Sequence, residues 1–131
     1  MAVADRNGLP VAVGIASGER GEVALVHDVL EQRFVDELPA NLIGDKPYDS
    51  NKLDAELKAK GVEMIAPVNS RHTRNKQDRR RLRRYRRRWK VERLFAWMMR
   101  FRRVVTRYER KAENFFGSVK LACIAILLRR V

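Results

Sequence analysis

The sequence predicts an α/β domain that ends in a layer of helices. Two short apolar runs, residues 1–5 and 10–16, flank the Asn7-Gly8 pair, which is a strong signal for a β-hairpin. Short apolar segments then alternate with amphipathic segments, and the chain closes on long stretches with helical periodicity. The predicted order of elements is β-β-α-β-α-β-α-α, within a single domain of 131 residues.

The first predicted helix covers residues 22–36, and Pro39 is expected to end it. Its apolar residues recur at the spacing of an amphipathic helix and share one face: Val23, Val26, Leu30 and Phe34.

Two further strands are predicted at residues 41–44 and 62–66, with a helix from Ser50 to Lys60 between them. Ser50 is the predicted N-cap, because its hydroxyl can accept an N–H group of the first helical turn. Gly61 suits the end of the helix, where a left-handed residue is common.

The C-terminal half is predicted to be an exposed loop, at residues 69–78, followed by helices from about residue 79. A final helix over 113–129 is nearly all apolar in its second half and is expected to be buried. The helix before it carries an apolar stripe of Val91, Leu94, Phe95, Met98, Phe101 and Val105.

Positive charge is concentrated in one segment. The chain has a formal net charge of +13, and residues 71–110 hold 18 of its 29 Lys and Arg against three acids, a net of +15. The remaining residues carry a net of −2. A block of this charge favours a phosphate backbone as its partner, while the plainer alternative is a solvated arginine-rich helix.

Composition excludes several other classes of site. The single cysteine, Cys123, excludes a disulfide framework and a thiolate metal cluster, and His27 and His72 lack the spacing of metal ligands. The longest apolar run, residues 121–128, is too short to span a bilayer, and no signal peptide is recognisable. The sequence therefore predicts a cytoplasmic protein that binds a polyanion and no membrane.

A polar stripe lies in the basic block. Tyr85, Arg88, Glu92 and position 99 stay within about 40° of one line on a helix. Glu92 has two interpretations: it forms i,i±4 ion pairs with neighbouring arginines, or it holds a divalent metal against a phosphate.

Asp45 is a second candidate carboxylate. It follows a short apolar strand and Gly44, at the edge of the sheet where ligands bind in open α/β folds. A lone Asp after a strand is also a common turn residue, and Asp49, just before the predicted cap, fits a turn role better.

Together these residues resemble the C-terminal part of insertion-sequence DDE transposases, the group with a Tyr-x2-Arg-x3-Glu-x6-Lys signature. The matching segments are VADRNGLPVAV, GDKPYDS and YRRRWKVERLFAWMMRFRRVVTRYERKAENFFGSVKLACIAILLRR. The resemblance covers essentially the whole chain.

The resemblance implies a ribonuclease-H-like fold and metal-dependent phosphoryl transfer on DNA. Two Asp and one Glu bind two Mg²⁺ ions (or Mn²⁺) in that family. Asp45 matches the second Asp and Glu92 the Glu, so both are expected to be catalytic metal ligands. Tyr85 and Arg88 match the signature residues that contact the DNA backbone near the transposon end.

The arginines around the signature are further expected DNA contacts: Arg84, Arg87, Arg100 and Arg103. The signature Lys falls at Met99, which is uncharged. On a continuous helix Arg100 lies about 80° from the stripe, whereas Arg103 returns to within about 20° of Glu92 and is expected to supply the missing charge.

A second departure concerns the first Asp. In the family it lies on a strand before the hairpin, and this sequence begins at the hairpin, where Asp5 is a turn residue. The expected fold is thus an incomplete catalytic core without its first strand, with residues 1–68 as the β-β-α-β-α-β part and 69–131 as the basic loop and helices.

The function predicted from the resemblance is that of the C-terminal part of a DDE transposase, inactive alone and dependent on an upstream segment that carries the first Asp. Its partners would be transposon ends, target DNA, that upstream segment and a second copy in a homo-oligomer. The alternatives are a non-catalytic DNA-binding relic or inhibitor of the full-length transposase, and a basic RNA-associated protein, for which Asp45 and Glu92 are not required.

Overall fold

The computed structural model describes residues 1–68 and 83–130. The predicted loop at 69–78 and the predicted start of the helix near residue 79 lie outside the described residues. The chain forms two compact units, Met1–Val35 with Trp89–Val131 and Asp36–Arg88, and each is described by itself. The organisation as one domain divided after residue 68 stays a prediction.

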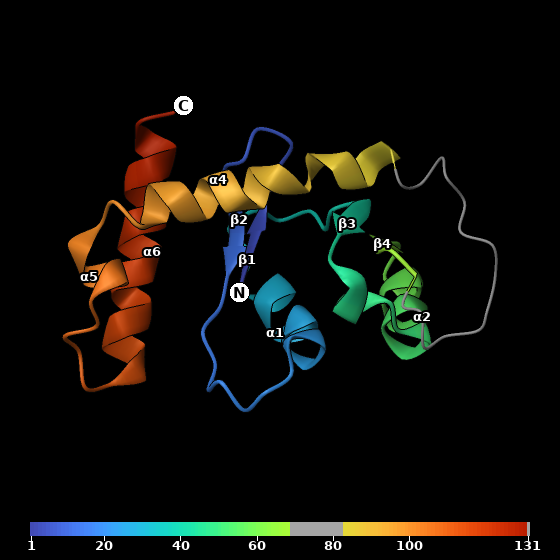
Figure 1. Ribbon diagram of the computed structural model, residues 1–131, viewed down its shortest axis with the longest axis horizontal. Coiled ribbons are helices and arrows are strands. Elements are labelled where there is room, and N and C mark those ends of the chain that lie inside the picture. The colour runs from blue at the N-terminus through green and yellow to red at the C-terminus, as the bar shows by residue number, and fades with distance from the viewer. Residues whose placement is uncertain (69–82, 131) are drawn as a thin grey trace. The chain divides into compact units, whose positions relative to one another are not determined.

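The first unit begins with the predicted hairpin. Strands β1 (Ala2–Ala4) and β2 (Pro10–Val13) pair antiparallel (Figure 1). Asp5 closes the turn, because its Oδ1 accepts the N–H groups of Asn7 at 2.7 Å and Leu9 at 2.8 Å. The prediction that Asp5 is a turn residue is therefore confirmed.

Gly8 occupies the one turn position that requires a glycine. Its φ is +80°, in the left-handed region that residues with a Cβ rarely adopt. A Cβ there would also lie 2.8 Å from Nη2 of Arg93, whose guanidinium donates to the carbonyl of Asn7. The hairpin turn and the helix that carries Arg93 are thus fastened to each other.

The first helical segment is shorter than predicted. A 3₁₀ turn (Glu22–Leu25) leads into α1 (Val26–Glu31), which ends well before Pro39. Val26 and Leu30 are buried as predicted, but Phe34 is exposed. The helix ends early because the chain turns to the edge of β2, where the N–H of Phe34 donates to the carbonyl of Val11 at 2.7 Å.

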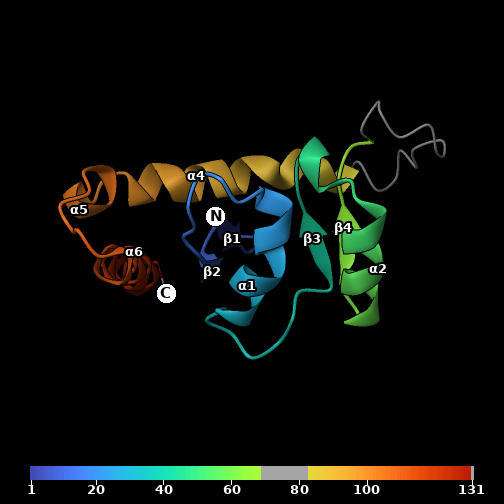
Figure 2. The ribbon, with the colours of Figure 1, turned by 90° about the horizontal axis from the view of Figure 1, so that it is seen from below.

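The second unit contains a β-α-β segment that agrees with prediction. Strands β3 (Asn41–Ile43) and β4 (Glu63–Ile65) pair in parallel, and α2 (Asn51–Ala59) packs along β4 (Figure 2). The Ser50 side chain accepts the N–H of Leu53 at 3.5 Å, which confirms the cap. Gly61 follows the helix with φ +76°. The unit closes with helical residues 83–85 and a 3₁₀ turn at Arg86–Arg88.

Three helices complete the first unit: α4 (Trp89–Met98), α5 (Arg102–Val105) and α6 (Ala112–Leu128). Helix α4 lies across the hairpin and packs against α6 (Figure 1). Leu94 and Met98 are buried in one cluster with Val13 and Cys123, whereas Phe95 and Val105 of the predicted apolar stripe are exposed.

Helix α6 is only partly buried, contrary to prediction. Its buried residues are Val119, Ala122, Cys123 and Ile126, and the opposite face exposes Leu121, Ile124 and Leu128. The sequence signal fails here because the helix is apolar on both faces while the unit covers only one. Within the described segments no helix is both long and apolar enough to cross a membrane.

The mixed α/β class is confirmed. Among the described residues the strands form two sheets of two strands each, one antiparallel (β1-β2) and one parallel (β3-β4).

Replacing Gly8 with alanine should destabilise the first unit. The substitution strains a backbone at φ +80° and displaces the Arg93 guanidinium, so the free energy of unfolding should fall by about 1–3 kcal/mol. Thermal or urea unfolding measures the loss. Gly18→Ala is the matched control, since nothing lies within 4 Å of a Cβ at Gly18. Equal stabilities of the two variants would contradict the described turn.

Stability should also depend on pH through Cys123. Burial raises the pKa of this thiol from 9.0 to about 11, so the folded state holds the proton more tightly than the unfolded chain. The stabilising contribution is present below pH 9.0 and is lost as the pH rises to about 11. Urea unfolding across that range should show a steeper loss for the parent than for Cys123→Ala. Identical pH profiles would argue against the buried thiol.

Candidate functional site

Asp45 lies where the sequence predicts, directly after β3 and Gly44. It precedes a 3₁₀ turn, Lys46–Tyr48, which Pro47 favours by its fixed φ, and the backbone carbonyl of Asp45 accepts the N–H of Tyr48 at 2.9 Å. The Asp45 side chain makes no capping bond to this turn. The turn is therefore closed by the backbone, and the carboxylate is left for other contacts.

Gly44 sets the path of the chain into Asp45. A Cβ at this position would lie 2.5 Å from Cε of Met64 and 2.8 Å from the ring of Tyr48. The flexible end of Met64 can move aside, but a Cβ would displace the Tyr48 ring, so Gly44 lets that ring close over the end of β3.

Three predicted site residues come together in the second unit. The Oδ1 atom of Asp45 accepts a hydrogen bond from the Tyr85 hydroxyl at 3.1 Å and also forms an ion pair with Nη1 of Arg88. Nη1 of Arg88 further donates to the Tyr85 hydroxyl at 3.1 Å, and its guanidinium lies 5.6 Å from the centre of that ring. We call Asp45, Tyr85 and Arg88 the carboxylate cluster.

The carboxylate cluster is open to solvent. About half of the Asp45 side chain is exposed, as is 39% of Arg88. All the bonds described for the carboxylate go to Oδ1, so Oδ2 has no donor among the described residues. The half-exposed carboxylate therefore keeps one oxygen that Arg88 and Tyr85 do not use.

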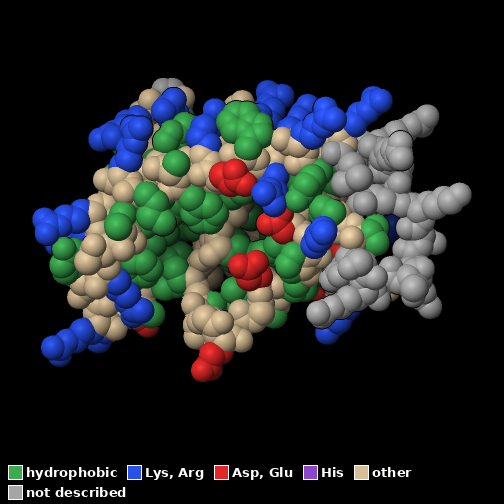
Figure 3. Space-filling view, in the orientation of Figure 1, with side chains coloured by type: hydrophobic (Ala, Val, Ile, Leu, Met, Phe, Trp, Pro, Cys, Tyr) green, Lys and Arg blue, Asp and Glu red, His purple; other side chains and the backbone are tan. Residues whose placement is uncertain are grey.

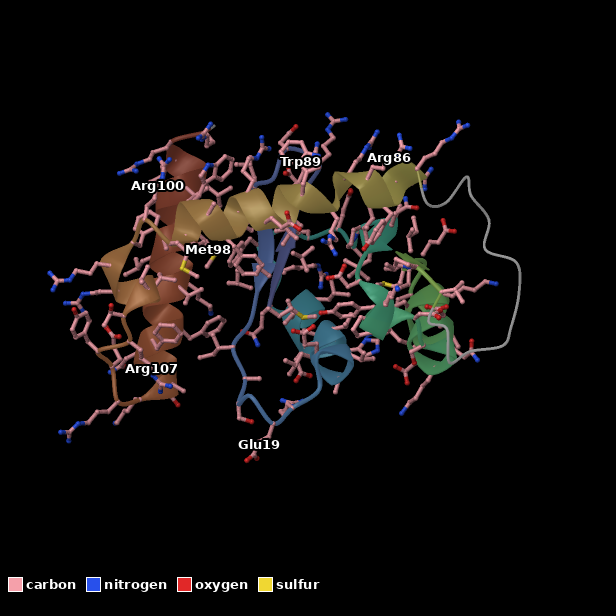
Figure 4. The ribbon with its side chains drawn as sticks, viewed as in Figure 1. Glu19, Arg86, Trp89, Met98, Arg100 and Arg107 are labelled. Carbon is pink, nitrogen blue, oxygen red and sulfur yellow. The ribbon has the colours of Figure 1, made fainter. Side chains whose placement is uncertain are left out.

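The other arginines of this unit differ in what they contact. Arg84 donates to the side-chain oxygen of Asn41, the first residue of β3. Arg87 is exposed, as is Arg86, which extends away from the backbone (Figure 4).

Glu92 belongs to the first unit, whereas Asp45 belongs to the second. Its carboxylate is exposed in the first turn of α4, where the helix dipole favours a negative charge. The opposite face of the same turn is fixed by Leu94, which is fully buried.

The continuous helix assumed for the polar stripe is not present. Helix α4 ends at Met98, so Met99 lies beyond it, and Arg103 belongs to the separate helix α5. The chain turns at Phe101, whose extended backbone directs its ring against the buried cluster. The expectation that Arg103 returns to the direction of Glu92 is therefore wrong; its Nη1 instead pairs with Glu109 at 3.1 Å.

Sequence reasoning missed an alternation of cations and indole rings on α4. The Arg93 guanidinium lies 4.8 Å from the Trp89 ring centre and 5.0 Å from that of Trp97, and Arg130 lies 4.3 Å from Trp97. The spacing of four residues between Trp89, Arg93 and Trp97 was the available signal. Trp89 remains half exposed, and its place on the outer side of α4 is visible in Figure 4.

The donors available to a metal are carboxylate oxygens, the ligands that Mg²⁺ prefers. Within residues 1–68 and 83–130 no group of three His, Cys, Asp or Glu side chains is arranged to hold an ion. Asp45 in the second unit and Glu92 in the first each carry a carboxylate, which has the right chemistry for such a ligand.

Two curated relatives are similar to the chain. A protein described as a transposase of insertion sequence element IS402, from Burkholderia cepacia, is 29% identical over 132 residues, which cover 95% of this chain and 59% of that protein. A protein described as a transposase of element IS6501, from Brucella ovis, is 30% identical over 128 residues, which cover 98% of this chain and 95% of that protein. No solved structure matches the chain.

A family model described as a transposase DDE domain matches residues 1–128. Membership of this family implies a ribonuclease-H-like fold. Since the match covers nearly the whole chain and both relatives are described as insertion-sequence transposases, the chain belongs to the transposase DDE domain family.

Proposed function

We propose that this chain contributes the second Asp and the Glu of a DDE transposase that cleaves and joins DNA strands by metal-dependent phosphoryl transfer. The carboxylate cluster is the observation that carries this proposal. Asp45 and the pair Tyr85 and Arg88 are about 40 residues apart, yet both side chains of the pair contact one carboxylate oxygen. All three are positions that match the family's motifs.

The proposed metal ligands are Asp45, through Oδ2, and Glu92. Mg²⁺ or Mn²⁺ bound there, two ions in the complete site, would supply the polarisation of the phosphodiester and the activation of the attacking water or 3′-hydroxyl. Tyr85 and Arg88 orient the Asp45 carboxylate by holding Oδ1. The third carboxylate of the family comes, in this proposal, from the upstream transposase segment.

DNA is the proposed partner of the basic surface, as transposon end and as target. Arg88 can contact a phosphate from its exposed side, and Arg84, Arg87, Arg100 and Arg103 add backbone contacts that carry no sequence information. Contacts of this kind fix the position of the DNA backbone on the protein. A homo-oligomer and a cytoplasmic location are further parts of the proposal.

A non-catalytic role, as a relic or as an inhibitor of the complete transposase, is the second candidate. One observation favours it: Met99 stands where the signature has Lys, is more than half exposed and lies past the end of α4. A chain that binds the ends of the element and lowers nicking by the complete enzyme would support this role.

Removing either carboxylate should abolish cleavage without weakening DNA binding. The chain is combined with the upstream segment, fused or in trans, and nicking of DNA that carries the element's ends is measured with Mg²⁺ or Mn²⁺. Asp45→Asn and Glu92→Gln should each lower nicking by about 10- to 100-fold or more, because a lost ligand costs no less than a lost outer-shell contact. Binding should persist because no positive charge is removed.

The control for these two variants is Glu19→Gln, which removes one carboxylate from the exposed loop between β2 and α1 (Figure 4). It should nick as the parent does. If Glu92→Gln also nicks as the parent does, Glu92 is a surface residue and its assignment as a metal ligand is wrong.

Binding to DNA should depend steeply on salt. If six or more phosphates are contacted, affinity should fall by about 10³-fold or more between about 50 and 200 mM salt, because bound counterions are released on binding. Fluorescence anisotropy with duplexes of unrelated sequence measures both the salt slope and the weak selectivity. A flat salt titration would exclude backbone contacts as the basis of binding.

A further inference from the structure

The first turn of α4 carries Glu92 but no residue of the core. The buried residues of this helix are Leu94 and Met98, and both follow Glu92 in the chain. Leu94 lies about 160° from Glu92 around the helix axis, so the core contact sets the rotation of the helix without holding its first residues. Helix ends fray where few contacts hold them. The start of α4 therefore needs another contact if the Glu92 carboxylate is to keep one position.

That contact is made with the turn of the β1-β2 hairpin. Nζ of Lys90 donates to the carbonyl of Arg6, and the Arg93 guanidinium donates to the carbonyl of Asn7. Figure 1 shows the turn beside α4, and Figure 3 shows Lys and Arg side chains together with hydrophobic side chains over the same region. Two donors three residues apart on the helix thus bind two consecutive carbonyls of one turn.

The turn is held in place where α4 binds it. Oδ1 of Asp5 accepts the N–H of Asn7 at 2.7 Å, and the backbone carbonyl of Asp5 accepts the N–H of Gly8 at 3.0 Å. These N–H groups belong to the same two peptide groups whose carbonyls bind Lys90 and Arg93. Each peptide group is therefore held on one side by Asp5 and on the other side by α4.

The Arg93 side chain is itself held between two indole rings. Its guanidinium lies 4.8 Å from the centre of the Trp89 ring and 5.0 Å from that of Trp97. Among the described residues Arg93 forms no ion pair, and its Nε is buried without an acceptor. A buried donor without a partner opposes folding, so the position of this guanidinium calls for a reason other than stability.

We propose that Arg93 is a positioning residue for Glu92: by fastening the start of α4 to the hairpin turn, it sets where the Glu92 carboxylate lies when a divalent metal binds. The inference rests on the proposed function, in which Glu92 is a metal ligand. Arg93 does not act on Glu92 directly, because adjacent residues on a helix do not face each other. It acts through the helix backbone, in the way that outer contacts of a metal site orient the ligands.

The test measures Mn²⁺ binding as well as nicking, with the chain combined with the upstream segment. Electron paramagnetic resonance follows the bound Mn²⁺. Arg93→Gln should weaken Mn²⁺ binding about 10-fold, as the loss of an outer contact of a metal site does, and nicking should recover at saturating Mn²⁺. Arg93→Lys should lie between this variant and the parent, because a lysine keeps a donor for the Asn7 carbonyl but lacks the planar group that fits between the rings.

Gly8→Ala disturbs the same contact from the other side and leaves every charge in place. A Cβ at Gly8 would lie 2.8 Å from Nη2 of Arg93, so this variant should weaken Mn²⁺ binding as Arg93→Gln does. If both variants bind Mn²⁺ as the parent does, the hairpin turn does not position Glu92 and the inference is overturned.

Two controls separate positioning from stability and from charge. Val119→Ala removes apolar contacts from the core of the same unit without touching the turn. Lys120→Gln removes a cation that lies 4.3 Å from the Phe116 ring centre, on α6. Both should bind Mn²⁺ as the parent does below their unfolding temperatures. If Val119→Ala weakens Mn²⁺ binding as much as Arg93→Gln, the effect is one of stability and the inference is overturned.

The failure of this inference is distinguishable from the failure of the proposed function. If Glu92→Gln weakens Mn²⁺ binding and Arg93→Gln does not, the positioning role is overturned and the proposed function stands. If Glu92→Gln leaves Mn²⁺ binding unchanged, Glu92 is not a metal ligand and both fail at this residue. Arg93→Gln should also retain the salt slope of DNA binding. A smaller salt slope with unchanged Mn²⁺ affinity would make Arg93 a phosphate contact and overturn its positioning role.

Discussion

The packing of one helix face fixes most of what the first unit presents to solvent. Leu94 and Met98 of α4 are buried against Val13 of the hairpin and Cys123 of α6. This contact sets the rotation of α4 about its axis, and with it the outward directions of Glu92 and Trp89. A change in the core would therefore alter the exposed carboxylate and the cation–indole contacts together, the latter partly through Trp97, which packs against the buried cluster.

In the second unit, the end of strand β3 positions a charged side chain, the carboxylate of Asp45. Gly44 admits two large side chains beside the backbone, and the turn after Asp45 is closed by main-chain bonds. The carboxylate is thus free of a local capping role and meets Tyr85 and Arg88 instead. A charge placed in this way anchors the arginine through one oxygen and keeps the other oxygen without a donor among the described residues.

The sequence predicts well those elements whose signals are local. Asn7-Gly8 marks the hairpin, and Ser50 with Gly61 marks both ends of α2, because each of these residues acts on backbone groups a few positions away. The end of α1 could not be predicted, since it depends on a bond from Phe34 to the edge of β2. The end of α4 likewise depends on where the Phe101 ring finds the core.

The candidate site also contains features that local sequence predicts and features that only tertiary contacts decide. Asp45 and its strand can be predicted from an apolar run followed by Gly-Asp. The signature residues can be predicted from their spacing. The pairing of Arg88 with Asp45 and of Arg103 with Glu109 is decided by tertiary contacts. Helical angles computed from sequence assume one straight helix, and they lose meaning where a 3₁₀ turn or a chain reversal intervenes.

Several cations of the basic segment form contacts within the fold. Lys90 and Arg93 donate to carbonyls of the hairpin turn, Arg107 donates to the carbonyls of Glu109 and Arg110, and Arg103 is neutralised by Glu109. These cations keep their charge, but each has at least one donor engaged within the fold. Substituting Lys90 or Arg93 would therefore remove a contact of the hairpin turn as well as a positive charge.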